Sequence, residues 1–306
     1  MVVHGTTARF YWHTRDWSPY VESAELAMTR STAEHRPLSG NSVRRKLGHR
    51  ATAVTLGGAA WERATVDANA WARFDESASR PWVYLPNGDT VGAIAYCGLA
   101  LDNNEQRVAG DDIVRLPVGL VGTDKLDRGV VLRALAAGGS SPGSSVNGGV
   151  QPLLVGNHDG ADNVAVLTDA DGNWTVDALI GWTLTNTTDG SSGLVTANTA
   201  TTITARLAGG TQNDWDTNDA FTLTPLGGAA YLLCTAISGA AANLAVVVQD
   251  SANNVDWATL VSMTAVTAVG SEQKLVAGIV RRYLRVSWTL TGTNPSATWF
   301  MAFGRR

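Results

Sequence analysis

The C-terminal part of the chain most narrows the choice of fold, because residues 228–306 consist of short apolar runs separated by polar turns. The runs are AAYLLCTAI, NLAVVVQD, WATLVSMTAV, EQKLVAG, RRYLRVSWTLTG and ATWFMAFG, and the turns include SGAAAN, DSANN, AVGSE and TGTNPS. Short strands at close to regular spacing predict a compact β-sandwich. We expect Trp257, Trp288 and Trp299 to be large packing residues within it.

The first 135 residues predict a β-sheet domain with one packed helix. Segment 65–78, TVDANAWARFDESA, gives the clearest helical signal, with Ala68, Trp71 and Ala72 on one face and Asp67 near the start. The strand-like runs are residues 8–29, 51–58, 80–86, 90–101 and 111–121.

A long polar stretch interrupts this domain. Residues 30–50 carry six Lys or Arg and one Glu, with few large apolar side chains. The pattern predicts a loop of about twenty residues between two strands, and loops of that length are usually functional or disordered.

Charge and composition divide the chain further. Residues 136–149 are rich in Gly and Ser and predict a flexible linker. Residues 150–225 are rich in Thr and Val, and residues 136–225 hold nine Asp against one basic residue, Arg206. We therefore predict that three parts follow residue 135. They are the linker, an acidic all-β module or insertion at 150–225, and a C-terminal sandwich at 226–306.

The sequence offers little to catalysis. None of the five histidines has a partner at i, i+4, no G-x-S-x-G motif occurs, and GGSSPGSSVNGG lacks the Lys of a phosphate loop. Cys97 and Cys234 lie in apolar runs, which indicates buried free thiols. We expect no enzyme, no cofactor, no signal peptide and no membrane span.

Two acidic turns are weak candidates for calcium. The four carboxylates that could supply oxygen ligands at alternate positions are Asp169, Asp171, Asp214 and Asp216. Neither turn has the register of an EF-hand. The alternative is that Asp and Asn serve here as ordinary turn formers.

Several segments resemble the major tail tube proteins of long-tailed, siphovirus-like bacteriophages. They are Ser18-Pro19-Tyr20, Arg30-Ser31-Thr32-Ala33-Glu34, the return strand ATAVTLGG at 51–58, the helix at 65–78 and DKLDRGVVLRALAAG at 124–138. The segments YLLCTAISG, VVVQDSANNVDWATL, RRYLRVSWTLTG and FGRR resemble a β-sandwich appended to tail and other virion proteins. The block at 150–225 departs from the family pattern.

The resemblance implies a mainly β fold: a tail-tube-type sandwich or barrel at 1–135 and an outer decoration sandwich at 226–306. It implies a virion protein, made in the host cytoplasm, that forms rings of six copies. The rings would stack into a tube, through which DNA passes without specific binding. The expected partners are further copies, the tape measure, the tail terminator and the distal tail protein.

Within this resemblance the long polar stretch would contact a neighbouring ring. The residues expected to make that contact are Arg36, Arg44, Arg45, Lys46 and Arg50. The channel would be lined by acidic or neutral groups, because a basic lining would bind DNA and resist its passage. Strand alternation allows Glu22 or Glu25 to face the channel, but not both.

Two other functions are consistent with the sequence. One is a different virion protein, such as a head decoration or baseplate component. The other is a carbohydrate-binding protein that stacks sugars on Trp174, Trp182 or Trp215.

Overall fold

The computed structural model is almost entirely β, which confirms the predicted fold class. It describes residues 7–35, 44–58, 67–74, 76–109, 114–139, 141–147, 154–174, 176–177, 179–180, 182–224, 226–251, 253–281 and 283–306. In this part of the chain no helix has the length and apolar character that a membrane crossing requires.

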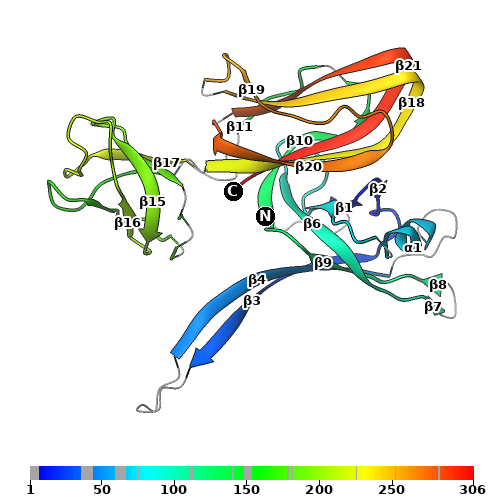
Figure 1. The fold of residues 1–306 in the computed structure, drawn as a ribbon, viewed down its shortest axis with the longest axis horizontal. Coiled ribbons are helices and arrows are strands. Elements are labelled where there is room, and N and C mark those ends of the chain that lie inside the picture. Colours follow the sequence, from blue (N-terminus) through cyan, green and yellow to red (C-terminus); the bar gives the residue numbers. More distant parts are fainter. Residues whose placement is uncertain are drawn as a thin grey trace.

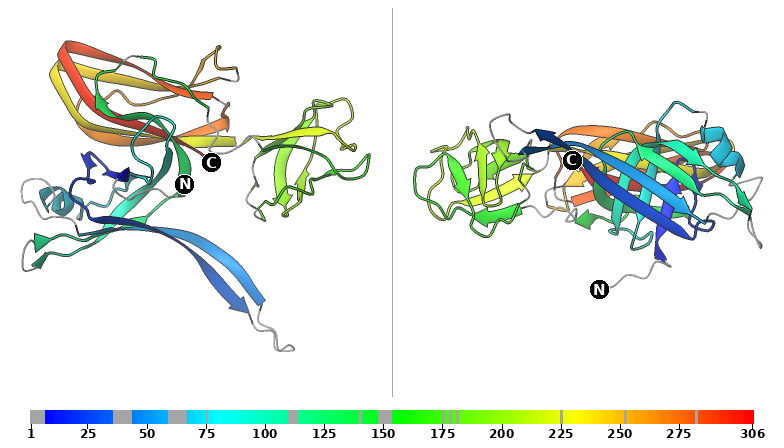
Figure 2. Two further views of the ribbon diagram at one scale, coloured as in Figure 1. Left: turned by 180° about the vertical axis from the view of Figure 1, so that it is seen from behind. Right: turned by 90° about the horizontal axis from the view of Figure 1, so that it is seen from below.

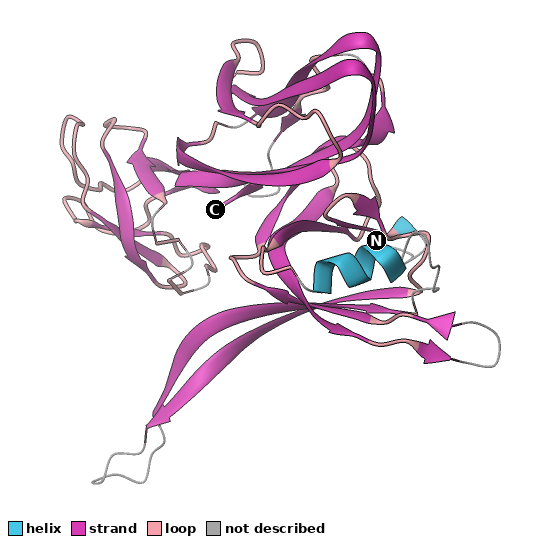
Figure 3. Cartoon of the chain, turned by 45° about the vertical axis from the view of Figure 1, so that its right-hand side comes forward, coloured by secondary structure: helices cyan, strands magenta, loops and turns pink. Residues whose placement is uncertain are grey.

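A thirteen-stranded sheet forms what we call the body (Figure 1). Its strands are β1 (Arg9–Trp12), β2 (Arg15–Asp16), β3 (Ser23–His35), β4 (Arg44–Gly57), β5 (Arg80–Leu85), β6 (Ile94–Glu105), β9 (Val118–Gly122), β10 (Asp127–Ala137), β11 (Val146–Asn147), β18 (Leu226–Ser251), β19 (Ala258–Ser262), β20 (Gly270–Ile279) and β21 (Tyr283–Arg305). A small ribbon of β7 (Val108–Ala109) and β8 (Val114–Arg115) and the helix α1 (Ala68–Phe74) lie at one end of the body (Figures 1 and 3).

The helix lies where the sequence predicts it, but it buries a different face. Ala70 is fully buried beside Trp82 and Ala100, whereas Trp71 is 63% exposed. The expected face of Ala68, Trp71 and Ala72 points to solvent. A short helix with one small buried residue can sit close to the sheet, and this leaves its largest side chain outside.

Two long strands, β18 and β21, pair along almost their whole length and bend together (Figure 1). The ladder shifts register between Ser238 and Ala240 and again before Asn243, at the segments that the sequence predicts as hairpin turns. Gly239 and Gly292 adopt φ of 109° and 130° at this corner. The predicted turns SGAAAN and TGTNPS are therefore corners inside a continuous ladder.

The bent ladder encloses the core of the C-terminal sandwich. Trp299 is buried there, as predicted, with Met301 and Leu244, while Trp288 and Trp257 are half-buried. Trp288 contacts Trp299 edge to face, with ring centroids 5.2 Å apart.

The body is continuous, so the predicted break between the first domain and the C-terminal sandwich is wrong. Strand β10 pairs with β6 on one side and with β21 on the other, where Val130 lies opposite Phe303. A second core joins the two parts, with Tyr11 and Val83 from the first and Tyr231 and Phe300 from the last. Separating them would expose this core to water.

The predicted linker is also packed in its described part. The Arg133 guanidinium lies 4.3 Å from the Trp299 ring and 5.0 Å from the Trp288 ring. It donates to the carbonyl oxygens of Ala134 and Gly138. The Gly143 amide donates to the Val286 carbonyl, and β11 pairs with β21. The described part of this segment therefore follows β21 closely.

A buried ionic group ties the C-terminus to the start of β10. The Tyr231 hydroxyl donates to Asp127 over 2.5 Å, and Arg306 Nε donates to the same carboxylate over 2.9 Å. Arg306 also reaches Asp124 over 2.7 Å. Burial raises the pKa of Asp127, although its bonds to Tyr231 and Arg306 act against this. The Asp127 carboxylate has these hydrogen-bond donors only when β10, β18 and the C-terminus are packed together.

Residues 154–224 form a second folded unit, which we call the acidic module (Figure 2). Its sheet has the order β12-β17-β14-β15-β16-β13. The strands are β12 (Leu154–Asn157), β13 (Val166–Thr168), β14 (Thr183–Asn186), β15 (Ser192–Asn198), β16 (Thr202–Ala205) and β17 (Ala220–Thr224). Its core contains Leu184, Phe221 and Trp215, and the Asp159 amide donates to the Thr168 carbonyl, which draws the two edges of the sheet together.

Candidate assembly surface

The main surface feature is a long β-hairpin, the arm, formed by β3 and β4 (Figures 1 and 2). The ladder runs from Ser23 opposite Gly57 to His35 opposite Arg44. Most of the predicted loop at 30–50 is therefore a two-stranded ladder, which corrects that prediction. The sequence of this stretch shows no alternation of apolar and polar residues, which is why it does not indicate strands.

The base of the arm is anchored and its outer part is not. Strand β9 pairs with β4 from Ala53 to Leu56, and Val54 and Leu56 are buried in the core of the first domain. Beyond Ala53 no third strand is present in the described residues. Met28, the first large side chain past the core on that face, is 65% exposed. An isolated two-stranded ribbon is marginally stable in water.

The residues predicted to contact a neighbouring ring lie along this outer part. Arg44, Arg45, Lys46 and Arg50 are on β4, opposite His35, Glu34, Ala33 and Arg30 in the register. Arg36 lies outside the described residues. The register therefore places Arg30 directly opposite Arg50.

The sheet at the arm's base has two free edges on opposite sides. Four strands follow one another in the order β3-β4-β9-β6, and each pair is antiparallel. In the described part of the chain, β3 pairs only with β4. On the far side, the ladder between β5 and β6 ends at Ala100, so Leu101–Glu105 of β6 pairs only with β9. Free edges of this kind can pair with another chain.

The face of this sheet that points away from the core carries small side chains. One cross-strand row holds Ala27, Ala53 and Val121, and the next holds Glu25 and Thr55. All five are exposed or half-buried. Glu25 thus lies on the outer face, whereas Glu22 precedes β3 and pairs with Arg115 over 3.3 Å.

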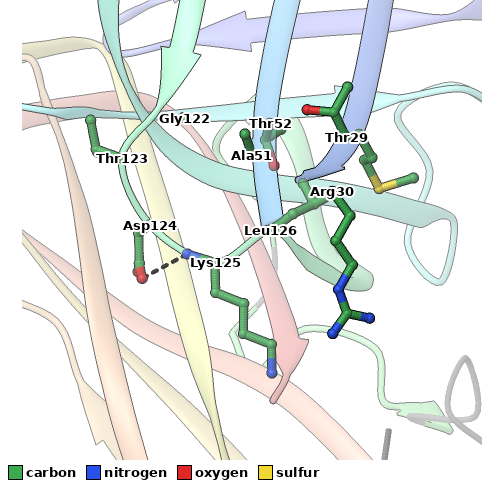
Figure 4. Close-up of a pocket in the computed structure, with 10 residues that line it drawn as sticks. Thr29, Arg30, Ala51, Thr52, Gly122, Thr123, Asp124, Lys125 and Leu126 are labelled. Carbon is green, nitrogen blue, oxygen red and sulfur yellow. Dashed lines mark hydrogen bonds between the residues drawn. The ribbon is translucent and has the colours of Figure 1, made fainter. Parts of the chain in front are cut away.

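A groove of about 640 Å³ lies at the base of the arm, on the opposite face (Figure 4). Its walls are β3, β4 and the connection between β9 and β10. Met28, Thr52 and Leu126 contribute to the lining, and Arg30 and Lys125 supply positive charge. The Asp124 carboxylate is turned back to the Lys125 amide, at 2.7 Å.

Two of the weak calcium candidates accept hydrogen bonds from backbone amides. Asp169 accepts the Asp171 amide in a turn, and Asp216 accepts the Asn163 amide. The contact made by Asp169 is that of an ordinary turn former. No group of three or more His, Cys, Asp or Glu that could hold a metal occurs among the described residues.

The tryptophans considered for sugar stacking belong to the core of the acidic module. Trp215 is fully buried, and Trp174 and Trp182 are half-buried against the same core. The structure therefore corrects the idea that Trp215 offers an exposed platform. Both cysteines, Cys97 and Cys234, are free and buried, as the sequence indicates.

Comparison with protein-family models finds no match, and comparison with curated proteins finds none either. Among solved structures, a chain from the virion of a native gene transfer agent particle shares 11% identity over 42% of this chain and 98% of its own, with a TM-score of 0.33. A chain from the tail of an empty gene transfer agent particle, solved with C6 symmetry, shares 12% identity over 35% of this chain and 80% of its own, with a TM-score of 0.29.

The SPP1 Dit protein, described as a hub adsorption protein of phages that infect Gram-positive bacteria, matches over a longer span. It shares 8% identity over 97% of this chain and 98% of its own, with a TM-score of 0.29. None of these values reaches the level at which a shared function follows.

Proposed function

We propose that the protein is a structural, non-catalytic subunit of a phage-like tail, and more specifically the subunit of the tail tube. The observation that carries this proposal is the four-stranded sheet with free edges on both sides. Because β3 and β6 run antiparallel to each other, β3 of one copy can continue the antiparallel order next to β6 of the next copy. Where the rotation between copies closes, repetition of this contact forms a ring in which neither β3 nor the Leu101–Glu105 segment of β6 is left as a free edge.

The outer face of the sheet suits the wall of a DNA channel. In a closed ring the core and α1 lie outside, so the face with Ala27, Ala53 and Val121 would line the interior. Glu25 supplies negative charge there, and the rows that contain it hold no Lys or Arg. Such a lining would not attract the phosphate backbone.

The arm supports stacking of the rings. Its outer ladder carries the basic residues of β4, and no described strand pairs with it within the copy. Contact with an adjacent ring would cover the ribbon, and acidic groups there would complement its basic residues. Arg36, Arg44, Arg45, Lys46 and Arg50 remain the residues proposed for this contact.

The test is electron microscopy of the purified full-length protein at high concentration. We expect rings and stacked tubes. A matched variant joins Thr29 to Ala51 through an Asn-Gly turn and so removes the unsupported ladder. It should keep the thermal transition of the body and lose the tubes. Tubes of normal length from this variant, or a parent protein that stays monomeric at every concentration, would contradict the proposal.

A second candidate is a baseplate, distal tail or decoration protein. The acidic module favours it, because a folded unit with its own core and net negative charge suits a role in contacts at the outside of a particle. The same micrographs separate the two functions. Single rings that do not stack, from a protein with the arm intact, would favour this candidate over the tube.

A further inference from the structure

The end of the body that carries α1 presents a rigid aromatic side chain. Trp71 is 63% exposed, and the Arg107 guanidinium covers one side of its ring at 5.2 Å. Arg107 is itself held by Asp67 at 2.5 Å and by Glu105 at 3.3 Å. The charge of Arg107 is therefore compensated, and Arg107 positions one side of the indole while most of the Trp71 side chain stays exposed. Aromatic residues that are fixed before binding often dominate the energy of an interface.

The groove at the base of the arm has matching properties. Met28 and Leu126 offer apolar contact, and the strands around them are short of neighbours because the ladder between β4 and β9 has ended. Arg30 and Lys125 stand at the groove, and cations attract the face of an indole. An exposed apolar recess next to a free edge favours a protein partner.

The two features lie on the same side of the sheet. Met28 and Arg30 alternate with the outward Ala27 and Thr29, so they share the face of Leu26, which packs on the core. Helix α1 covers that core face through Ala70 and contacts β6. Trp71 stands at the free end of β6, because Arg107 follows Glu105 in the chain.

Within one copy the features are at opposite edges. Strand β3 is one edge of the four-stranded sheet and β6 is the other, which separates them by roughly 14 Å. They are also offset along the strands, since Glu105 is level with Ala24, whereas Met28 is level with Ala100. When β3 of one copy pairs with β6 of the next with a stagger of about four residues, as the tilted strands of a closed barrel require, the helix of the second copy comes over the groove of the first. The occupant of the groove is then another copy of this chain.

We propose that Trp71 of one copy packs into the groove at the base of the arm of the adjacent copy, between Met28 and Leu126 and beside Arg30 and Lys125. This inference rests on the proposed ring, since it names the side-chain contact that accompanies the pairing of β3 with β6. The contact is heterologous, so it closes only when the ring closes.

The first test is a disulfide between copies. Chains that carry Trp71→Cys together with Met28→Cys, or with Arg30→Cys, are oxidised under conditions in which the parent forms rings. We expect a ladder of covalent oligomers on a non-reducing gel, because the two positions are too far apart to react within one copy. The native thiols do not interfere, since both are buried. A control pairs Met28→Cys with Val255→Cys, where Val255 is 75% exposed in the C-terminal sandwich, and should give no ladder.

The second test is the concentration at which assembly begins. Trp71→Ala should raise it at least tenfold, which corresponds to about 1.4 kcal/mol per contact. Val255→Ala removes a comparably exposed apolar side chain outside the contact and should leave it unchanged.

The outcomes separate this inference from the proposed function. If rings form but the disulfide ladder does not, the proposed Trp71 contact is wrong and the proposed ring stands. The same conclusion follows if Trp71→Ala leaves unchanged the protein concentration at which assembly begins. A protein that forms no rings at any concentration overturns both.

Discussion

The body and the acidic module reach stability in different ways. In the body, segments from both ends of the chain share one sheet, and their common core includes Tyr11 near the start and Phe300 near the end. In the module, every core residue lies between Leu154 and Leu223. The comparison shows that a Gly- and Ser-rich segment does not by itself mark a domain boundary. The boundary is decided by which side chains share a core.

The largest expected effect follows from cutting the body in two. A chain of residues 1–135 lacks β18 and β21, so Val131 and Cys97 lose their apolar neighbours and β10 gains a free edge. We expect no cooperative unfolding transition by circular dichroism. Removal of residues 154–224 and closure with a short Gly-Ser segment should leave a cooperative transition. A cooperative transition in the 1–135 chain would show that these residues fold as an independent domain, as the sequence predicts.

Two matched Phe→Ala substitutions, one in each core, test whether the body and the acidic module unfold independently. Phe300→Ala removes a ring from the core that joins the two parts of the body, and Phe221→Ala removes one from the module. Each should cost about 3–5 kcal/mol of unfolding free energy. In calorimetry, Phe221→Ala should lower only the transition of the module, and Phe300→Ala only that of the body. A single transition that moves in both variants would show that the two units unfold together.

The buried ionic group predicts a smaller effect. Tyr231→Phe removes the hydroxyl that donates to Asp127 and accepts from Gln273 at 2.8 Å. We expect a loss of about 1–3 kcal/mol, because the buried carboxylate loses a donor. Chemical denaturation measures it. Tyr96→Phe, in β6 of the same body, is the control and should cost less than half as much.

The smallest predicted effect is a dependence on pH through His13. This side chain is buried, its Nδ1 lies 2.6 Å from Ser271 Oγ, and burial together with Arg73 and Arg80 lowers its pKa to about 4. The unfolded chain binds this proton near pH 6.5, so unfolding free energy falls as pH drops from about 6.5 to about 4.

The loss due to His13 should reach about 1 kcal/mol at pH 5.5. It is measured as the difference in pH slope between the parent and His13→Gln. Equal slopes in the two proteins would show that His13 does not contribute.

The sequence indicates the β class well, because apolar runs such as AYLLCTAI and turn clusters are local properties. It does not separate a corner from a hairpin turn. SGAAAN and TGTNPS contain the Gly and Asn that either requires, and only the pairing of β18 with β21 along both halves decides between them. Register between distant segments depends on partners that local sequence does not specify.

The arm shows why the candidate site was only partly predictable. Residues 30–50 indicate a basic segment, but they lack the apolar and polar alternation that would mark them as two strands. The helical spacing of Trp71 with Ala68 and Ala72 suggests burial, whereas the structure leaves its side chain 63% exposed. An aromatic residue flanked by Ala68 and Ala72 could equally have signalled an exposed anchor.

The attachment of the acidic module has a consequence for how such a chain can change. The module leaves the body after β11 and returns before β18, and both points lie on the same side of the body (Figure 1). No ladder of the body runs through it. A different domain with closely spaced ends could therefore replace the module during evolution or be inserted by design. The body would keep its fold while the inserted domain changes.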